Sequence, residues 1–469
     1  MIRSKQLFVF IILLIPFICA GQSSSTNMLS YANFLQLVKQ NHPLAKKANL
    51  IIQSADANTL IARGSFDPKI FYEFNNKFYN AKNYYQLGEG GFKIPTWFGI
   101  ELKGGFEQNQ GELLNPENLT PKNGLVYSQI SLPLMQGFVI DERRSTLKQA
   151  KLFQELSNYE KINAINELLY NAGKAYWDWQ LSYSNLQIYQ MAVSLAKERY
   201  DANVRSSALG DKPAIDTVEA VIQLQDRILN MQQALMEYKT KTLFLSGFLW
   251  LENDTPIELT ENTIPDRSIE EIESGSISFT NYQLLDSLIN NHPSLKIYDF
   301  KLKQLAIEKK FKSDKLKPIL NINYNPIYNA DNIILNFQNN YKWGLAVGFP
   351  IFLRKERGDL QLTKIKINNT MYENANKRNE LVVKAKATVN ELNTYNNQIE
   401  TYIKNVNNYE RLWKYEKRLF SLGESSLFMI NAREVSYLNA KIKYNDIIYK
   451  NNKAVLDAEY TLGLLNSLF

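Results

Sequence analysis

The two histidines of the chain are the first residues that could do chemistry. His42 and His292 both stand in the same tripeptide, Asn-His-Pro. Imidazole is a general base and a common metal ligand, so one interpretation is a split catalytic or metal site. A proline directly after each histidine instead indicates a helix that stops and resumes. Because the tripeptide occurs twice, we favour a structural helix-kink element over a ligand.

The N-terminal segment removes most other reactive groups. Residues 1–21 carry two cations, a short apolar run and then small residues, which is the pattern of a secretory signal peptide cleaved after Ala20 or Gly21. Cys19, the single cysteine, lies in this segment. A lipoprotein would acylate Cys19, but bulky residues precede it. We therefore expect an exported chain with no disulfide, no catalytic residues, no cofactor and no metal site, and not an enzyme.

Charge and hydropathy narrow the class of protein further. The formal net charge is +7, from 54 Lys and Arg against 47 Asp and Glu, and the charges alternate in sign along the chain. A nucleic-acid-binding protein needs a concentrated basic face, so we expect no nucleic acid as a partner. Beyond residue 21 no apolar run approaches the ~20 residues of a transmembrane helix.

Four stretches alternate between apolar and polar residues. They are residues 69–79, 125–134, 319–328 and 341–351. Each is close to the ~9–11 residues that a tilted strand needs to cross a bilayer. Four strands cannot close a barrel, so in a membrane several chains must share one. A soluble β-sandwich with one buried face is the alternative.

A partly alternating piece rich in Gly, Asn and Pro separates the first two strands. We interpret residues 80–124 as an external loop, and whether residues 84–121 add barrel strands stays open.

Two long stretches without proline predict rods. Residues 145–208 and 359–421 repeat apolar residues three and four apart. At 1.5 Å per residue each makes a helix of roughly 95 Å. Each rod ends at a glycine, Gly210 or Gly423, where a left-handed C-cap fits and the chain reverses. We expect the N-terminal helix, residues 29–61, to pair with the part of the second rod that its own return helix leaves uncovered.

The order of these elements occurs twice. Helix with an Asn-His-Pro kink, strands, long helix, Leu-Gly-acid tip and return helix appear in both halves. We interpret this as an internal duplication, with a first repeat over residues 22–300 and a second over 281–469. A polar, proline-containing break at 251–280 ends the first hairpin.

In this arrangement the chain resembles the TolC family of outer-membrane efflux proteins over essentially the whole mature sequence. SLPLMQGFVIDERR and GFPIFLRKERGDLQLTKIKI resemble the strand-to-helix passages of the family, and ALGDKPAIDTVEAVIQLQ resembles its first periplasmic hairpin tip. PTWFGIELKGGFEQNQG is similar to the loop of Bacteroidetes-type members.

The resemblance implies a mainly α protein with a β-barrel part. Three chains would give four strands each to one 12-stranded transmembrane β-barrel, and the helices would form a periplasmic α-barrel. It also implies a periplasmic adaptor protein and an inner-membrane pump as partners, with contact at the hairpin tips. The tip residues are Leu209, Gly210, Asp211, Leu422, Gly423 and Glu424.

The family narrows its pore with acids six and nine residues past the second tip glycine. Here those positions are Met429 and Ala432, so that constriction is not carried over. Asp216 and Glu219 stand six and nine residues past Gly210, one helical turn apart, and are our candidates for the charged aperture. A solvated helix face explains them equally well.

Together these observations favour a passive exit duct of a tripartite efflux or type I secretion system in the outer membrane of a Gram-negative bacterium, with a periplasmic helical extension. An exported coiled-coil rod or adhesin without transport activity is the alternative, although such a rod needs no alternating strands.

Overall fold

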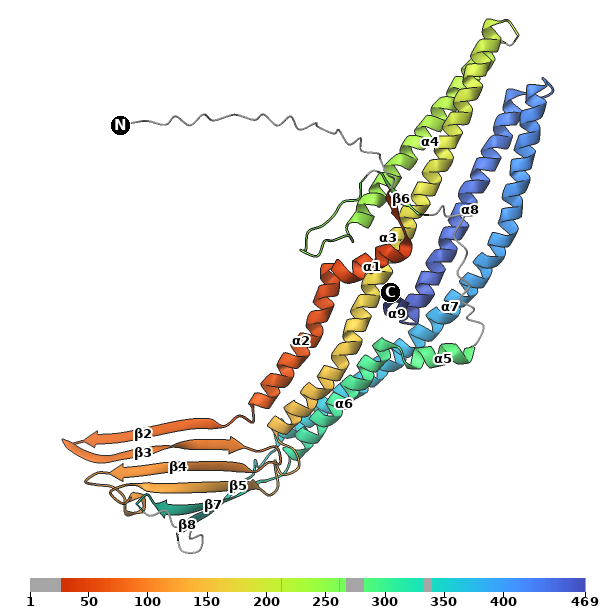
Figure 1. Ribbon diagram of the computed structural model, residues 1–469. Coiled ribbons are helices and arrows are strands. Elements are labelled where there is room, and N and C mark those ends of the chain that lie inside the picture. Colours follow the sequence, from red (N-terminus) through yellow and green to blue (C-terminus); the bar gives the residue numbers. More distant parts are fainter. Residues whose placement is uncertain (1–26, 212, 261, 267–281, 332–339, 469) are drawn as a thin grey trace, which may run out of the picture.

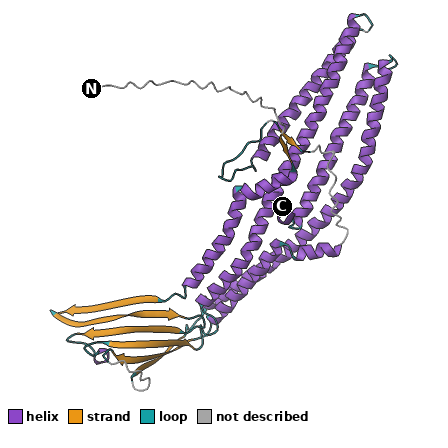
Figure 2. Cartoon of the chain, viewed as in Figure 1, coloured by secondary structure: helices purple, strands orange, loops and turns teal. Residues whose placement is uncertain are grey.

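The structure is a computed structural model that describes residues 27–211, 213–260, 262–266, 282–331 and 340–468. The predicted signal peptide, residues 1–21, lies outside these ranges, as do residues 267–280 of the predicted break. The described part is elongated, with a twisted sheet at one end and long helices extending from it (Figure 1). The six long strands gather at one end, and apart from one short strand pair the rest of the length is helical (Figure 2).

The sheet is antiparallel throughout and has six strands in the order β2-β3-β4-β5-β7-β8. Their bounds are β2 (Lys69–Tyr79), β3 (Lys82–Pro95), β4 (Glu101–Gln110), β5 (Leu125–Pro133), β7 (Ile319–Asn329) and β8 (Tyr341–Gly348). β2, β5, β7 and β8 lie at the four alternating stretches of the sequence. In the described part of the chain, β2 and β8 are the edges of this sheet.

The sheet of the described chain therefore has six strands, two more than the four alternating stretches predicted, and residues 80–124 are not the external loop that we expected. β3 and β4 fill most of that interval, and residues 84–121 do add strands. Their alternation is hard to see in the sequence because glycines occupy Gly88, Gly90, Gly91, Gly104 and Gly105. A glycine contributes neither an apolar nor a polar side chain to a period-two pattern, so the strand signal fades.

The two faces of the sheet differ in chemistry. On one face apolar side chains project into solvent, and Ile70, Trp343 and Val347 are 90%, 70% and 70% exposed. The opposite face carries charged and amide side chains, among them Glu89 and Lys103. An apolar face this exposed on a single chain is typical of a surface that contacts lipid or another chain.

The described residues contain nine helices, two of them very long. They are α1 (Tyr31–Asn41), α2 (Pro43–Gly64), α3 (Glu142–Ala208), α4 (Ala214–Ser246), α5 (Tyr282–Asn290), α6 (Pro293–Asp314), α7 (Arg354–Ser421), α8 (Leu427–Thr461) and α9 (Leu465–Leu468). A 3-10 turn, η1 (Pro116–Asn118), lies between β4 and β5. α3 has 67 residues and α7 has 68, so each is about 100 Å long.

The lateral order of the helices differs from one expectation. α4 packs along α3 and α8 along α7, which gives two hairpins. On the sheet side of these hairpins α2 packs along α3, and α6 lies against both α3 and α7. The N-terminal helix thus does not cover the second rod of its own chain, because α6 already occupies that position.

Both histidines cap helices. His42 Nδ1 accepts the backbone N–H of Leu44 at 3.1 Å, and His292 Nδ1 accepts that of Ser294 at 3.1 Å. Each follows a short helix and begins the next one, α2 or α6, with a proline at its first position. The predicted kink role is confirmed. Burial lowers the pKa of both imidazoles, that of His292 to about 4, so they stay neutral.

The main core lies midway along the helices, where both ends of the described chain meet the rods. Phe34 of α1, Tyr176 and Trp179 of α3, Leu456 of α8 and Leu465 of α9 are buried together. Two polar side chains are satisfied at this level: Tyr176 donates to the Leu29 carbonyl at 2.9 Å, and Trp179 donates to Thr242 Oγ1 at 3.1 Å. A parallel pair of short strands, β1 (Asn27–Leu29) and β6 (Thr263–Pro265), ties the start of this region to the segment after α4.

Candidate functional site: hairpin tips and sheet

The two hairpin tips lie at the end of the molecule that is farthest from the sheet (Figure 1). Gly210 and Gly423 both adopt φ of +80°, the left-handed conformation that the sequence predicted for them. The next N–H closes each turn: Asp211 donates to the Ser206 carbonyl at 3.0 Å, and Glu424 donates to the Leu419 carbonyl at 2.9 Å. The duplicated Leu-Gly-acid motif therefore builds the same turn twice.

Each tip presents an apolar side chain to solvent. Leu209 is 77% exposed and Leu422 is 64% exposed, and both precede the turn glycine. Asp211 and Glu424 are also exposed. A protruding leucine beside an acid is a small amphipathic contact surface, which suits docking to another protein better than catalysis.

An ion pair that the sequence analysis missed joins the two hairpins near the tips. Arg199 Nη2 of α3 lies 2.7 Å from Glu434 Oε2 of α8, and the two side chains are only 9% and 3% exposed. Around it Trp413 stacks on Tyr437 at 5.3 Å between ring centroids. A groove of about 450 Å³ borders Arg199, Trp413 and Glu434. The partners are 235 residues apart, so no local sequence pattern could have paired them.

The candidate aperture acids lie in the first turns of α4. Asp216 and Glu219 are both half-buried, and Glu219 accepts a hydrogen bond from Gln223 Nε2 at 3.1 Å. Ala220, one turn after Asp216, is buried in a small cluster with Leu427 and Ile430 of α8. Both acids thus lie at the tip beside the second hairpin, and their assignment to an aperture stays a prediction.

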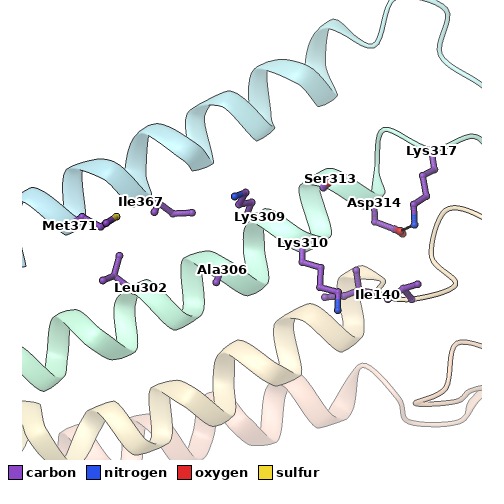
Figure 3. A pocket seen from close by; sticks show the side chains of 11 residues that line it. Ile140, Leu302, Ala306, Lys309, Lys310, Ser313, Asp314, Lys317, Ile367 and Met371 are labelled. Atoms are coloured by element: carbon purple, nitrogen blue, oxygen red, sulfur yellow. Dashed lines mark hydrogen bonds and ion pairs between the residues drawn. The ribbon is translucent and has the colours of Figure 1, made fainter.

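The other end of the helices carries cations where the sheet begins. A groove of about 710 Å³ runs along α6, between α7 and the segment that precedes α3 (Figure 3). Leu302, Ala306, Ile367 and Ile140 line it, together with Lys309 and Lys310. Nearer the sheet, Lys312 of α6 pairs with Asp359 of α7, with Nζ 2.8 Å from Oδ2. The junction therefore combines apolar and cationic side chains, as expected at a membrane–water boundary.

The polar face of the sheet contains a hydrogen-bonded network. Lys103 Nζ lies 2.7 Å from Glu89 Oε1, and the Tyr127 hydroxyl donates to the same carboxylate. Nearer the helices, Glu101 pairs with Lys93 at 2.7 Å and with Arg143 of α3 at 3.6 Å. These charges are compensated, and they make this face hydrophilic.

Two negative observations hold for the described residues. They contain no group of three or more His, Cys, Asp and Glu placed to hold a metal ion. None of the helices described is both long and apolar enough to cross a membrane.

Solved structures provide a comparison for the fold. No family model matches the sequence, and no curated protein matches it. Three similar structures, each aligned to 92% of this chain, are outer-membrane proteins. The CmeC outer-membrane channel of Campylobacter jejuni is 16% identical over 85% of its length, with a TM-score of 0.64. The outer-membrane protein VceC of Vibrio cholerae is 12% identical over 96%, at 0.63. The open-state MtrE outer-membrane channel of Neisseria gonorrhoeae is 11% identical over 88%, at 0.64.

At such low sequence identity these similarities show the fold alone. They span sheet, rods and hairpins together, which a generic helical rod would not match. The chain has the fold of the TolC-type outer-membrane channels.

Proposed function

We propose that the protein is a passive exit duct in the outer membrane, the last component of a tripartite efflux or type I secretion system. One observation carries this proposal: a single chain presents a sheet with an exposed apolar face, a charged opposite face and two open edges, joined to hairpins about 100 Å long. Such a sheet is stable in lipid only when its edges are closed by other copies.

The assembly that we propose is a homotrimer. Three sheets joined edge to edge form a β-barrel whose apolar face contacts outer-membrane lipid, and the helices continue the wall into the periplasm. The hairpin tips then face the inner membrane, where Leu209 and Leu422 contact a periplasmic adaptor protein coupled to a pump. We propose no catalytic role, because a duct needs none; the free energy of transport comes from the pump.

The mass of the purified particle tests the proposal. The mature protein should require detergent to stay in solution and should have the mass of three chains once bound detergent is subtracted. Analytical ultracentrifugation with refractive-index detection measures the mass of the particle and the amount of bound detergent. A particle of one chain that stays in solution without detergent would instead support the exported rod.

A further inference from the structure

The hairpin β3–β4 is the part of the sheet that the sequence did not predict. We propose that it belongs to the transmembrane wall itself, so that each copy contributes six strands and a barrel of three copies has three times six, or 18, strands. This inference deepens the proposed function and depends on it. The alternative is a hairpin outside the wall, with four wall strands per copy.

The pairing of the strands places the hairpin within the wall. β3 pairs with β2 on one side and with β4 on the other, and β4 pairs with β5. β2 and β5 are not neighbours. Removing β3 and β4 from the wall would leave an edge on each of these strands, so the hairpin is needed to connect the first strand of the chain to the rest of the sheet.

The hairpin also spans the full height of the sheet. Its turn, Thr96–Gly99, lies at the helix end, where Thr96 N donates to the Ile100 carbonyl at 3.0 Å. Arg144 of α3 lies against this turn: a Cβ atom on Gly99 would be 2.8 Å from its guanidinium. Arg144 also donates to the Phe138 carbonyl at 3.1 Å. A loop on the outer surface of the membrane would not reach the first turn of α3.

The apolar face of the sheet continues across the hairpin. The register places Ile94 beside Leu102 and Leu102 beside Ile130 of β5. Aromatic rings cover two of the glycines: a Cβ atom on Gly90 would meet the Tyr72 ring at 3.1 Å, and one on Gly104 would meet the Phe92 ring at 2.7 Å. Aromatic cover of this kind restores the apolar surface that a glycine lacks.

The polar face is continuous as well. Lys103 of β4 is paired with Glu89 of β3, which also accepts the hydroxyl of Tyr127 on β5. The network thus ties β3, β4 and β5 together on one face. Lipid outside and water inside is the only arrangement that satisfies both faces.

The consequence is a wider pore through the outer membrane. Barrel diameter grows roughly in proportion to the number of strands, so 18 strands give a barrel about 1.5 times as wide as 12. Barrels of about 16–18 strands enclose an aqueous channel. The lumen at the level of the membrane would then be hydrophilic and broad enough for cargo larger than single small molecules.

Spin labels on matched pairs of cysteines test this assignment. Because Cys19 is the only cysteine in the sequence, cysteines introduced into the mature chain carry the only labels. Leu102 and Lys103 of β4 are register partners of Ile130 and Gln129 of β5, so the four positions lie at two matched heights. Each is changed to Cys, labelled with a nitroxide and reconstituted in lipid vesicles. Accessibility to O₂ reports lipid, and accessibility to a water-soluble nickel chelate reports water.

We expect a several-fold higher ratio of O₂ to nickel accessibility at Leu102→Cys than at Lys103→Cys, matching Ile130→Cys against Gln129→Cys. If either β4 variant fails to assemble, Ile94→Cys and Lys93→Cys replace the pair, since they are the partners on β3. Alternation in β5 without alternation in β3 and β4 would overturn the six-strand wall while leaving the duct intact. No alternation in β5 would overturn the proposed function itself.

Discussion

The buried ion pair between Arg199 and Glu434 allows a quantitative prediction about the tips. Arg199→Met keeps most of the side-chain length but leaves the Glu434 carboxylate buried and unpaired. Breaking a buried pair costs about 3–5 kcal/mol. We expect the lower end, about 3 kcal/mol, because within the described residues Arg199 Nη1 and Glu434 Oε1 already lack hydrogen-bond partners. The loss should be local, at the contact between the first turns of α8 and the end of α3.

Hydrogen exchange measured by mass spectrometry detects such a local loss. A change of about 3 kcal/mol corresponds to exchange that is faster on the order of a hundredfold. We expect this in peptides covering residues 427–440, with peptides from the sheet unchanged. Combining Arg199→Met with Glu434→Leu should restore most of the protection, because no charge then stays buried alone.

A matched control lies at the same level. Lys417 Nζ is 4.0 Å from Glu198 Oε1, but this pair is exposed, so Lys417→Met should leave exchange almost unchanged. If Arg199→Met exchanged like the wild type, or like Lys417→Met, then the buried pair does not hold the hairpins together and the reasoning is wrong.

Three further predictions concern pH and backbone strain. Burial depresses the pKa of His292 to about 4, so the stability it contributes is complete above pH 6.5 and is lost as pH falls. His292→Asn keeps the helix cap but removes this titration. The variant should therefore reduce the drop in stability between pH 7.5 and pH 5 by up to about 2 kcal/mol, measured by denaturant unfolding in detergent. Burial raises the pKa of Glu459 to about 7, so the folded state binds this proton more tightly and loses stability as pH rises from about 4.5 through 7. Glu459→Gln should stabilise the protein at pH 8 by about 3 kcal/mol and have little effect at pH 4.5. Equal effects at both pH values would refute this prediction. Gly423→Ala, at φ of +80°, should cost about 1 kcal/mol, whereas Gly358→Ala inside α7 should stabilise by up to about 1 kcal/mol. An added Cβ atom meets nothing within 4 Å at either glycine, so thermal melting compares backbone effects alone, and a gain at Gly423 would contradict the left-handed turn.

Local patterns in the sequence predicted the parts of the fold that depend on local physics. Strict alternation located β2, β5, β7 and β8, and the absence of proline located the two rods. The tip glycines followed from the reversal of the chain, since a left-handed residue is needed there. The breaks between helices at His42 and His292 followed from the proline after each histidine, whereas the capping role of the imidazoles was seen only in the structure.

Features set by tertiary contacts were not predictable in this way. β3 and β4 were missed because their glycines interrupt the alternation, and their pairing with β2 and β5 supplies the register instead. The lateral position of α6 between α3 and α7 depends on how whole helices pack. Arg199 and Glu434 gave no signal because neither is unusual within its own helix. Asp216 and Glu219 were chosen from their spacing after Gly210, but spacing does not determine whether their carboxylates line an aperture.

Conductance across a planar lipid bilayer tests the central claim most directly. The purified mature protein should insert and give discrete, uniform current steps, because the polar face of the sheet encloses water. Asp216→Ala with Glu219→Ala should lower the preference for cations if these acids line the aperture, and unchanged selectivity would remove them from it. A preparation that inserts into the bilayer but never gives current steps would contradict the exit duct.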